Sequence, residues 1–179
     1  MSIQRVSGDI REVLASLGIS PELISARGLI LCGEAEDLVV VATDDDGREH
    51  RLAPSAAVAW HEMHAAARSD GVSIRIVSGF RSVDRQAQIV RAKLARGLAL
   101  DAILCVSAPP GYSEHHSGSA VDVTTDGVAA LDPGFENTPA FQWLSKNASR
   151  FGFLLSFPAN NPYGYAYEPW HWCHKEIEV

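Results

Sequence analysis

Histidine and carboxylate side chains gather in two short segments of the chain. Residues 113–122 read SEHHSGSAVD and include His115 and Asp122, while residues 168–171 read EPWH and include Glu168 and His171. Two imidazoles and one carboxylate are a common ligand set for a zinc ion that keeps a fourth coordination position open for water. His115, Asp122 and His171 are therefore the candidate metal ligands, and Zn²⁺ is the expected cofactor.

The residues around these ligands favour a shared site. Residues 118–120 read Gly-Ser-Ala, and because they are small we expect the chain to bend there and bring the first two ligands to one point. Pro169 disfavours a helical conformation of the residue before it. This predicts that Glu168 and His171 lie at the end of a strand or in a turn.

Three motifs occur along the chain in a fixed order. They are Ser78-Gly79-Phe80-Arg81-Ser82 followed by Gln86, the pattern S-x-H-x-x-G-x-A-x-D from Ser113 to Asp122, and Gly164-Tyr165 followed by Glu168-Pro169-Trp170-His171-Trp172. In order and interval they resemble the VanY-type zinc D-alanyl-D-alanine carboxypeptidases, the M15 peptidases. The resemblance covers residues 53–174, about two thirds of the chain, and three motifs together are more specific than one.

The resemblance implies a role for each matching residue. Zinc lowers the pKa of a bound water to about 7, so a neighbouring carboxylate can take its proton while the peptide carbonyl is attacked. The guanidinium of an arginine is always charged and suits a developing oxyanion or a terminal carboxylate. The implied roles are zinc binding for His115, Asp122 and His171, general base and acid for Glu168, catalysis on the substrate for Arg81, and substrate binding for Gln86, Ser113 and Tyr165.

The implied reaction is hydrolysis of the terminal D-Ala-D-Ala bond of peptidoglycan stem peptides or their precursors. Two departures from the family pattern bear on substrate preference: residues 155–158 read LSFP where the family often has Leu-Arg-Tyr-Pro, and residues 172–174 read WCH. Residues 118–124, GSAVDVT, are also similar to the VanX-type D,D-dipeptidases. A D,D-dipeptidase, an L,D-carboxypeptidase and a cell-wall endopeptidase with the same zinc mechanism therefore remain alternatives.

A further alternative is a binding module that keeps zinc without hydrolysis, as the related hedgehog signalling domains largely do. Glu168 and Arg81 argue against this alternative, because a structural zinc ion needs neither residue. His61 and His64 are three residues apart, whereas the metal-binding HExxH helix needs histidines four apart, so we expect them on a helix surface. For His116 we leave open a position behind the ligands or at the surface, and for Cys173 we expect a packing role.

The elements that must position these residues follow from periodicity and turn residues. Helices are expected over residues 7–18, from Pro54 to about residue 70, over residues 82–100 with Ser82 as N-cap and Ile89 in the core, and over residues 139–151. Residues 38–43 and 48–52 predict a hairpin, and residues 72–77 and 121–124 predict strands. The stretch from residue 153 predicts strands joined by a long loop. This mixture indicates an α+β fold, a small antiparallel sheet with helices packed on it, and the resemblance implies that it is hedgehog/DD-peptidase-like.

Composition sets the broad class. The chain has 179 residues, 46% of them apolar, and 15 basic against 22 acidic residues give a net charge of −7. This length suits one domain with a real core, and the acidic balance argues against a nucleic-acid partner. No apolar run approaches the roughly 18 residues of a membrane span. The three cysteines are widely spaced, so we expect them to be reduced and structural.

We expect residues 1–52 to form an N-terminal extension, a helix and a hairpin within the same domain, and residues 53–179 to form the zinc peptidase core. Charged residues interrupt the first twenty positions, where a secretion signal would need an apolar stretch. The expected location is therefore the cytoplasm, with the cell envelope, reached by a route that the sequence hides, as the alternative. The oligomeric state is left open.

Overall fold

The computed structural model describes residues 10–175 of the chain. Its helices are α1 (Ile10–Ser16), α2 (Pro21–Ala26), α3 (Pro54–Ser69), α4 (Val83–Ala95), α5 (Leu100–Leu104) and α6 (Pro139–Asn147). Three short 3₁₀ helices are η1 (Glu114–Ser117), η2 (Pro133–Asn137) and η3 (Ala148–Phe151). The strands are β1 (Val39–Thr43), β2 (Glu49–Leu52), β3 (Arg75–Ser78), β4 (Ala120–Thr124), β5 (Phe153–Leu155) and β6 (His171–His174).

The strands form an antiparallel hairpin, β1–β2, and a four-stranded sheet in the order β3–β4–β6–β5 with antiparallel neighbours throughout. All five residues of β4 are buried, as a central strand covered on both faces requires. The register places Asp122 of β4 opposite Ser78 of β3 on one side and opposite His171 of β6 on the other. One row across the sheet thus carries polar residues from three separate stretches of the chain.

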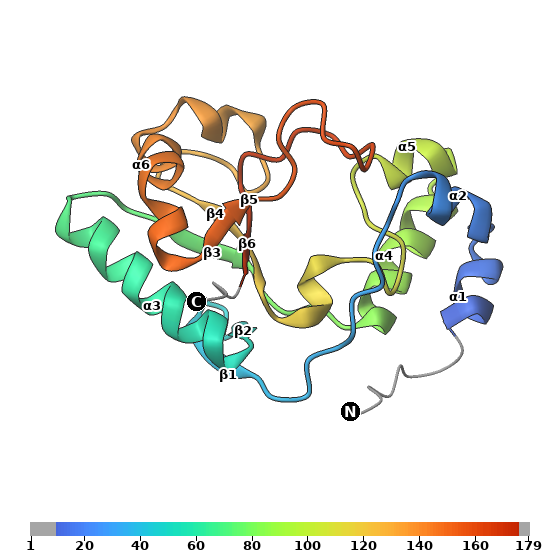
Figure 1. Ribbon diagram of the computed structural model, residues 1–179, viewed down its shortest axis with the longest axis horizontal. Coiled ribbons are helices and arrows are strands. Elements are labelled where there is room, and N and C mark those ends of the chain that lie inside the picture. Colours follow the sequence, from blue (N-terminus) through green and yellow to red (C-terminus); the bar gives the residue numbers. More distant parts are fainter. Residues whose placement is uncertain (1–9, 176–179) are drawn as a thin grey trace.

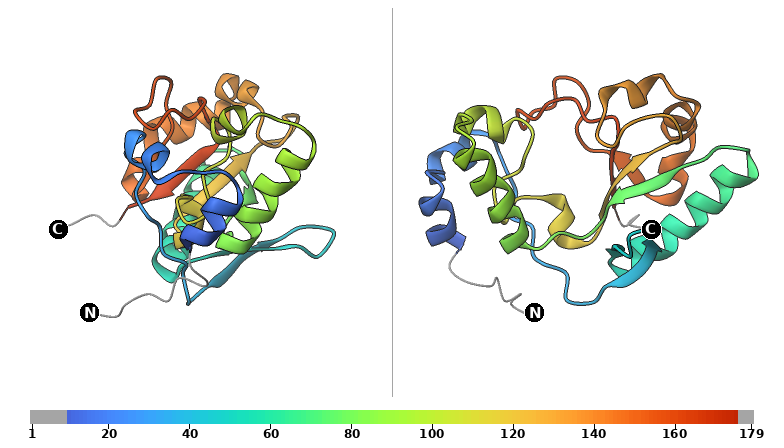
Figure 2. Two further views of the ribbon diagram at one scale, coloured as in Figure 1. Left: turned by 90° about the vertical axis from the view of Figure 1, so that its right-hand side faces the viewer. Right: turned by 180° about the vertical axis from the view of Figure 1, so that it is seen from behind.

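Two hydrophobic clusters stabilise the fold. The larger one joins α3 and α6 to the four-stranded sheet, and the smaller one joins α1 and α2 to α4 and α5. Figure 1 shows the sheet with α3 and α6 at one end of the molecule and the other four helices at the opposite end. In Figures 1 and 2, η1 and the chain that follows α2 run between the two ends. The elements that carry the candidate site are therefore strands of the larger cluster together with η1, which leads from them towards the smaller cluster.

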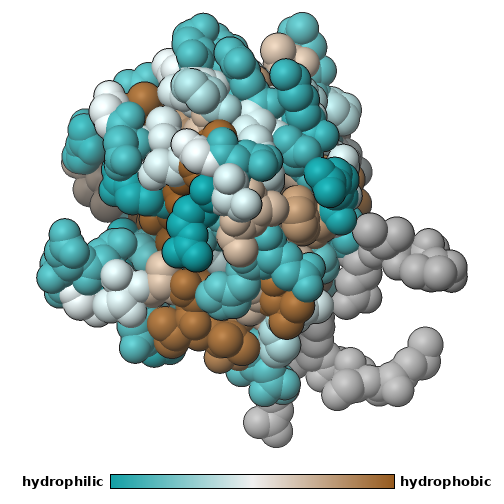
Figure 3. Space-filling view, turned by 90° about the vertical axis from the view of Figure 1, so that its left-hand side faces the viewer, coloured by the Kyte–Doolittle hydropathy of each residue, from teal (hydrophilic) through white to brown (hydrophobic). Residues whose placement is uncertain are grey.

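Helix α3 is amphipathic and closes one face of the larger cluster. Its residues Trp60, Met63 and Ala67 are buried, whereas Val58 is 60% exposed. The face formed by α3 and α6 is largely hydrophilic, with apolar side chains gathered low on it, as Figure 3 shows. None of the helices that the structure describes is long and apolar enough to span a membrane.

The segment before residue 53 is attached to the C-terminal loop by one side chain. Arg27, at the end of α2, donates from Nε to the carbonyl of Tyr163 at 2.6 Å and from Nη1 to the carbonyl of Leu104 at 3.0 Å. Its guanidinium also lies 4.6 Å from the ring centroid of Tyr165. A charge-assisted hydrogen bond from the N-terminal part of the chain thus holds the loop of residues 156–170 at Tyr163, and a second one attaches the same side chain to the end of α5.

The α+β class, the hairpin, the helix from Pro54 and the strand over residues 121–124 are confirmed. The predicted helix over residues 82–100 is wrong at its C-terminal end: α4 ends at Ala95, because Gly97 takes a left-handed φ of 81°. The strand predicted from residue 72 begins only at Arg75, and helix α6 continues beyond Asn147 as the 3₁₀ helix η3. Residues 7–9 of the predicted first helix lie outside the described residues, as do residues 176–179. The boundary at residue 52 stays a prediction.

The turn from η1 into β4 requires glycine at position 118. Gly118 has a φ of 69°, and a Cβ built on it would lie 2.7 Å from the amide nitrogen of Ala53. That amide donates a hydrogen bond of 2.9 Å to the Gly118 carbonyl, so the two backbones cannot separate without losing it. The tight turn joins the segment that carries His115 to the strand that carries Asp122.

We expect Gly118→Ala to lower the free energy of unfolding by about 3 kcal/mol, the left-handed conformation and the steric clash each contributing. Gly127→Ala is the matched control, since Gly127 has a φ of 80° but no atom within 4 Å of its Cβ position; it should lose only about 1 kcal/mol. Urea unfolding of both variants measures the difference. Equal losses would contradict the role of the close approach.

Candidate metal centre and active site

The three candidate ligands meet at one buried point. His115 comes from η1, Asp122 from β4 and His171 from β6, and one possible ligand atom of each lies within 4.8 Å of the others. Nε2 of His115 is 3.1 Å from Asp122 Oδ2, and Nδ1 of His171 is 2.9 Å from Asp122 Oδ1. Two ligands at about 2 Å from one tetrahedral ion lie about 3.3 Å apart, so this spacing fits a zinc ion.

The remaining ring nitrogen of each histidine has an acceptor of its own. Nδ1 of His115 lies 2.7 Å from the carbonyl of Gly79, and Nε2 of His171 lies 3.0 Å from Glu114 Oε2. Such acceptors hold an N–H on the outer nitrogen and leave the inner nitrogen with its lone pair, as a metal ligand needs. Donor set, spacing and ring orientation therefore all suit a divalent metal ion.

The charges of Asp122 and His171 depend on each other. Burial alone would raise the pKa of Asp122, but the two adjacent imidazoles hold it well below its usual range. Burial opposes a charge on His171, yet the hydrogen bonds that it donates to Asp122 and Glu114 raise its pKa to about 10. A buried cation is thus already stabilised at this point, and a metal ion would replace the proton on His171 Nδ1.

Glu168 borders the same point. It lies in the turn before β6, where its carbonyl accepts from the amide of His171 at 3.1 Å, which agrees with the predicted turn. Its Oε2 is 4.0 Å from His171 Nδ1. Burial raises the pKa of Glu168 to about 7, and the charge of Asp122 adds to this. A carboxylate with such a pKa can both take and return a proton near neutral pH.

Arg81 also lies close to the candidate ligands. Its Nη1 donates to Gln86 Oε1 at 2.9 Å, its Nη2 donates to Ser78 Oγ at 3.1 Å, and Nη2 lies 3.7 Å from Asp122 Oδ2. The backbone carbonyl of Arg81 is 2.6 Å from Nδ1 of His116. A positive charge is therefore fixed next to the metal point by several neighbours.

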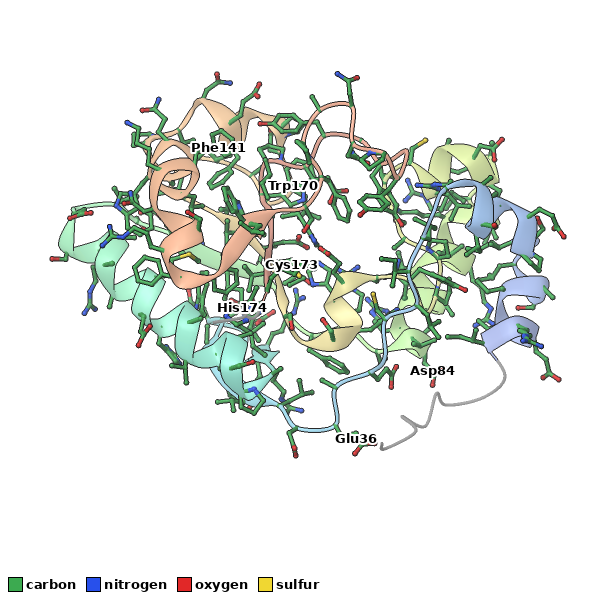
Figure 4. The ribbon with its side chains drawn as sticks, in the orientation of Figure 1. Glu36, Asp84, Phe141, Trp170, Cys173 and His174 are labelled. Atoms are coloured by element: carbon green, nitrogen blue, oxygen red, sulfur yellow. The ribbon has the colours of Figure 1, made fainter. Side chains whose placement is uncertain are left out.

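A cleft of about 590 Å³ opens onto this centre. Ser113 and Tyr165 line it together with Tyr167 and Trp170, and the buried Tyr165 hydroxyl has no hydrogen-bond partner among the described residues. Ile89, expected in the core, lines the cleft instead. Figure 4 shows Trp170 in the middle of the molecule. A neighbouring cavity of about 640 Å³ shares Glu114, Phe157 and Tyr165 with the cleft but is lined by none of the three candidate ligands.

Gln86 does not line the cleft. It is fully buried, accepts from Arg81 and donates from Nε2 to the carbonyl of Ala108 at 2.7 Å. In this structure it holds Arg81 in place, and its contact with a substrate stays a prediction.

The structure shows the surroundings of the histidines and the cysteine that the sequence analysis placed outside the ligand set. His116 is fully buried, and its Nε2 accepts from the amide of Gly111 at 3.0 Å, so it supports the Arg81 segment from behind. Cys173 is a free cysteine buried in β6, as expected for a packing role, and Figure 4 shows it at the centre of the molecule. His61 is exposed on α3 and His64 stacks on Trp60, as predicted for a helix surface.

Two residues of the site escaped the sequence interpretation. Glu114 bridges His171 and Lys175, with Oε1 2.8 Å from Lys175 Nζ. The ring of Phe157 packs on His171 with centroids 4.7 Å apart. Glu114 stands within the second motif and could have been singled out as a carboxylate beside a ligand. The sequence singles out Phe157 only as part of the LSFP stretch at residues 155–158, and its contact with His171 could not be foreseen because it depends on how the long loop folds back.

A family model and curated relatives that match this chain are all described as carboxypeptidases or as related peptidases. The family model described as "VanY: D-alanyl-D-alanine carboxypeptidase" matches residues 49–176. A curated D-alanyl-D-alanine carboxypeptidase of Enterococcus faecalis is 32% identical over 128 residues, which is 66% of this chain and 46% of that protein. The chain spans about half the length of the curated relatives that head the comparison.

Solved structures resemble the fold closely. The L,D-carboxypeptidase LdcB has a TM-score of 0.70 at 32% identity, over 79% of this chain and 69% of that one. VanYB in complex with D-alanine-D-alanine has a TM-score of 0.65 at 28% identity, over 84% and 83%. A mutant of the D,D-pentapeptidase VanY in complex with Zn(II) has a TM-score of 0.62 at 30% identity, over 79% and 81%.

The bridge through Glu114 predicts an effect on metal affinity. Glu114→Gln removes the negative charge that holds the N–H of His171 Nε2, so we expect divalent metal to bind at least about tenfold more weakly. Competition with a chromogenic chelator measures this affinity. Glu62→Gln, at an exposed position of α3, should leave it unchanged. Equal affinities of both variants would show that Glu114 does not position His171.

Proposed function

The chain belongs to the VanY family of D-alanyl-D-alanine carboxypeptidases, and we propose that it is a zinc-dependent D,D-carboxypeptidase. Its substrates in this proposal are peptides that end in D-Ala-D-Ala, above all peptidoglycan stem peptides and their precursors. The observation that carries the proposal is the convergence of His115, Asp122 and His171 with Glu168 and Arg81 at the edge of one cleft.

Zinc is the metal we propose for the site. His115, Asp122 and His171 would hold it, and the donor set of two imidazoles and one carboxylate matches that of catalytic zinc sites. The relative solved with Zn(II) belongs to the same family. When bound, zinc would supply Lewis acidity, which activates a water molecule and polarises the carbonyl of the scissile peptide bond.

Glu168 is the proposed proton carrier. Its carboxylate, 4.0 Å from the inner nitrogen of His171, would take a proton from the attacking water at Oε1 or Oε2. The same carboxyl group would then give that proton to the nitrogen of the leaving amino acid, so one residue serves as base and as acid. Its partial burial supports the first transfer, because a raised pKa makes the carboxylate of Glu168 a stronger base towards the attacking water.

Arg81 is the proposed stabiliser of negative charge. Gln86 and Ser78 fix its guanidinium before any substrate arrives, so little reorganisation is needed when the carbonyl oxygen becomes an oxyanion. Ser113 and Tyr165 would contact the peptide from the cleft wall, and the hydroxyl of Tyr165, which has no hydrogen-bond partner within residues 10–175, would serve as a donor or acceptor.

An L,D-carboxypeptidase is the second candidate, favoured by the likeness to LdcB. The proposed roles of the metal ligands, Glu168 and Arg81 would be the same, and only the accepted residue before the scissile bond would differ. A non-catalytic zinc-binding module is disfavoured, because such a module would need neither a buried carboxylate beside the metal point nor a fixed arginine.

The direct test is product analysis by mass spectrometry. We expect the zinc-loaded protein to release one D-Ala from a stem pentapeptide ending in D-Ala-D-Ala, and Glu168→Gln to lower the rate by at least about a thousandfold with zinc still bound. Loss of D-Ala from the tetrapeptide alone would favour the L,D-carboxypeptidase. His171→Ala is the second control and should lose both zinc and activity, whereas an active Glu168→Gln would refute the proposed proton carrier.

The rate should also depend on pH. Only the ionised form of Glu168 can accept the first proton, and burial raises its pKa to about 7 in the metal-free protein. A nearby dication favours the ionised form and lowers this pKa. We therefore expect kcat/KM to fall about tenfold per pH unit on an acid limb that lies below pH 7. An acid limb well above pH 7 would contradict this assignment.

A further inference from the structure

A second cation of the cleft has no part in the proposed reaction. Lys93 lies on α4, is half-buried and lines the cleft together with Arg81 and Glu168. Its Nζ donates to Ser107 Oγ at 2.7 Å, and Ser107 in turn donates to the carbonyl of Val106 at 2.8 Å. The ammonium group is thus anchored at the cleft wall by a neutral hydroxyl.

No carboxylate of residues 10–175 forms an ion pair with Lys93, although three acidic residues line the same cleft. Asp122 faces the two candidate histidine ligands, and Glu114 is shared by His171 and Lys175. An ammonium group has three donors, and the hydrogen bond to Ser107 uses one of them. Glu168, the third acidic residue, acts on Lys93 through its charge but forms no ion pair with it. The ammonium group of Lys93 is therefore without a direct carboxylate contact among the described residues and can take one from a ligand of the cleft.

The electrostatic surroundings agree with this. Burial lowers the pKa of Lys93, the charge of Arg81 lowers it further, and the charge of Glu168 raises it. Arg81 and Lys93 therefore repel each other across the half-buried cleft. Asp122 forms an ion pair with Arg81, whereas no carboxylate of the described residues lies at ion-pair distance from Lys93, so a carboxylate of the bound molecule that reached Lys93 would stabilise its charge.

Arg81 cannot bind the oxyanion of the scissile carbonyl and a separate carboxylate of the peptide at the same time. Its Nη2 stands 3.7 Å from Asp122 Oδ2, beside the metal point, where the carbonyl of the scissile bond must lie. A carboxylate elsewhere in the peptide lies at least one residue away from that carbonyl and needs a separate cation.

We propose that Lys93, anchored by Ser107, forms a carboxylate-binding subsite of the cleft and selects peptides that place a carboxylate there. This inference rests on the proposed function in taking the ligand to be a peptide. The carboxylate is either that of the C-terminal residue or that of a side chain upstream of the scissile bond, and both have the same chemistry.

Binding without turnover tests the subsite. In the Glu168→Gln background, calorimetry would give Kd for N-acetyl-Glu-D-Ala-D-Ala, for its C-terminal carboxamide and for the N-acetyl-Gln analogue. We expect one of the two neutral replacements to weaken binding about tenfold, which identifies the carboxylate. With Lys93→Met added, the same replacement should change Kd less than twofold. Lys93→Arg should keep most of the dependence.

Lys146→Met is the matched control, since Lys146 is exposed on α6 and does not line the cleft; it should keep the full tenfold dependence. If each neutral replacement in the peptide changes Kd by the same factor in the protein with Lys93 and in the Lys93→Met variant, the proposed subsite is wrong. Hydrolysis of the same peptides by the wild-type protein separates the two proposals. If the peptides are cleaved but the effect of the replacements on Kd does not depend on Lys93, only the subsite is overturned. If that effect depends on Lys93 but no peptide is cleaved, only the proposed function is overturned. If no peptide binds, both proposals are overturned.

Discussion

The pairing of β4 with β6 is the constraint on which the candidate centre depends. Asp122 and His171 are 49 residues apart in sequence, and they meet because they stand opposite each other in neighbouring antiparallel strands. Side chains directly opposite in such a pair share one face of the sheet. A slip of one residue would turn one of them to the other face. The backbone ladder, buried on both sides at β4, therefore fixes the metal geometry as well as the fold.

His115, the other candidate histidine ligand, is placed at the centre by a 3₁₀ helix and not by strand pairing. His115 lies on a 3₁₀ helix, and its ring is oriented by the Gly79 carbonyl, which belongs to the segment after β3. The amide of Arg81 donates to the His115 carbonyl at 3.1 Å, so the first and second motifs are joined by backbone as well as by side chains. His115, Arg81 and the carbonyl of Gly79 thus form one unit, which is attached to the edge of the sheet at β3.

Much of this arrangement could be predicted from sequence, because it depends on local signals. The Asp-rich turn before residue 48 and Ser82 as N-cap each act within a few residues, and the hairpin and the start of α4 are found where those signals place them. Helix α2 was missed although Ser20 caps it and Pro21 begins it, since its six residues give no periodicity. Glu114 contacts His171 across 57 positions of the chain, and Phe157 contacts it across 14. Spacing along the sequence does not reveal such contacts.

The walls of the cleft and its metal point come from different parts of the molecule. The candidate ligands stand on the sheet and η1, whereas α4 and the loop of residues 156–170, held by Arg27, supply much of the surrounding surface. Replacements in the walls can therefore accumulate during evolution while the ligand geometry is kept. A protein built in this way can change the peptides that its cleft accepts through residues 156–167 and one face of α4, while Glu168 and the three candidate ligands keep their positions.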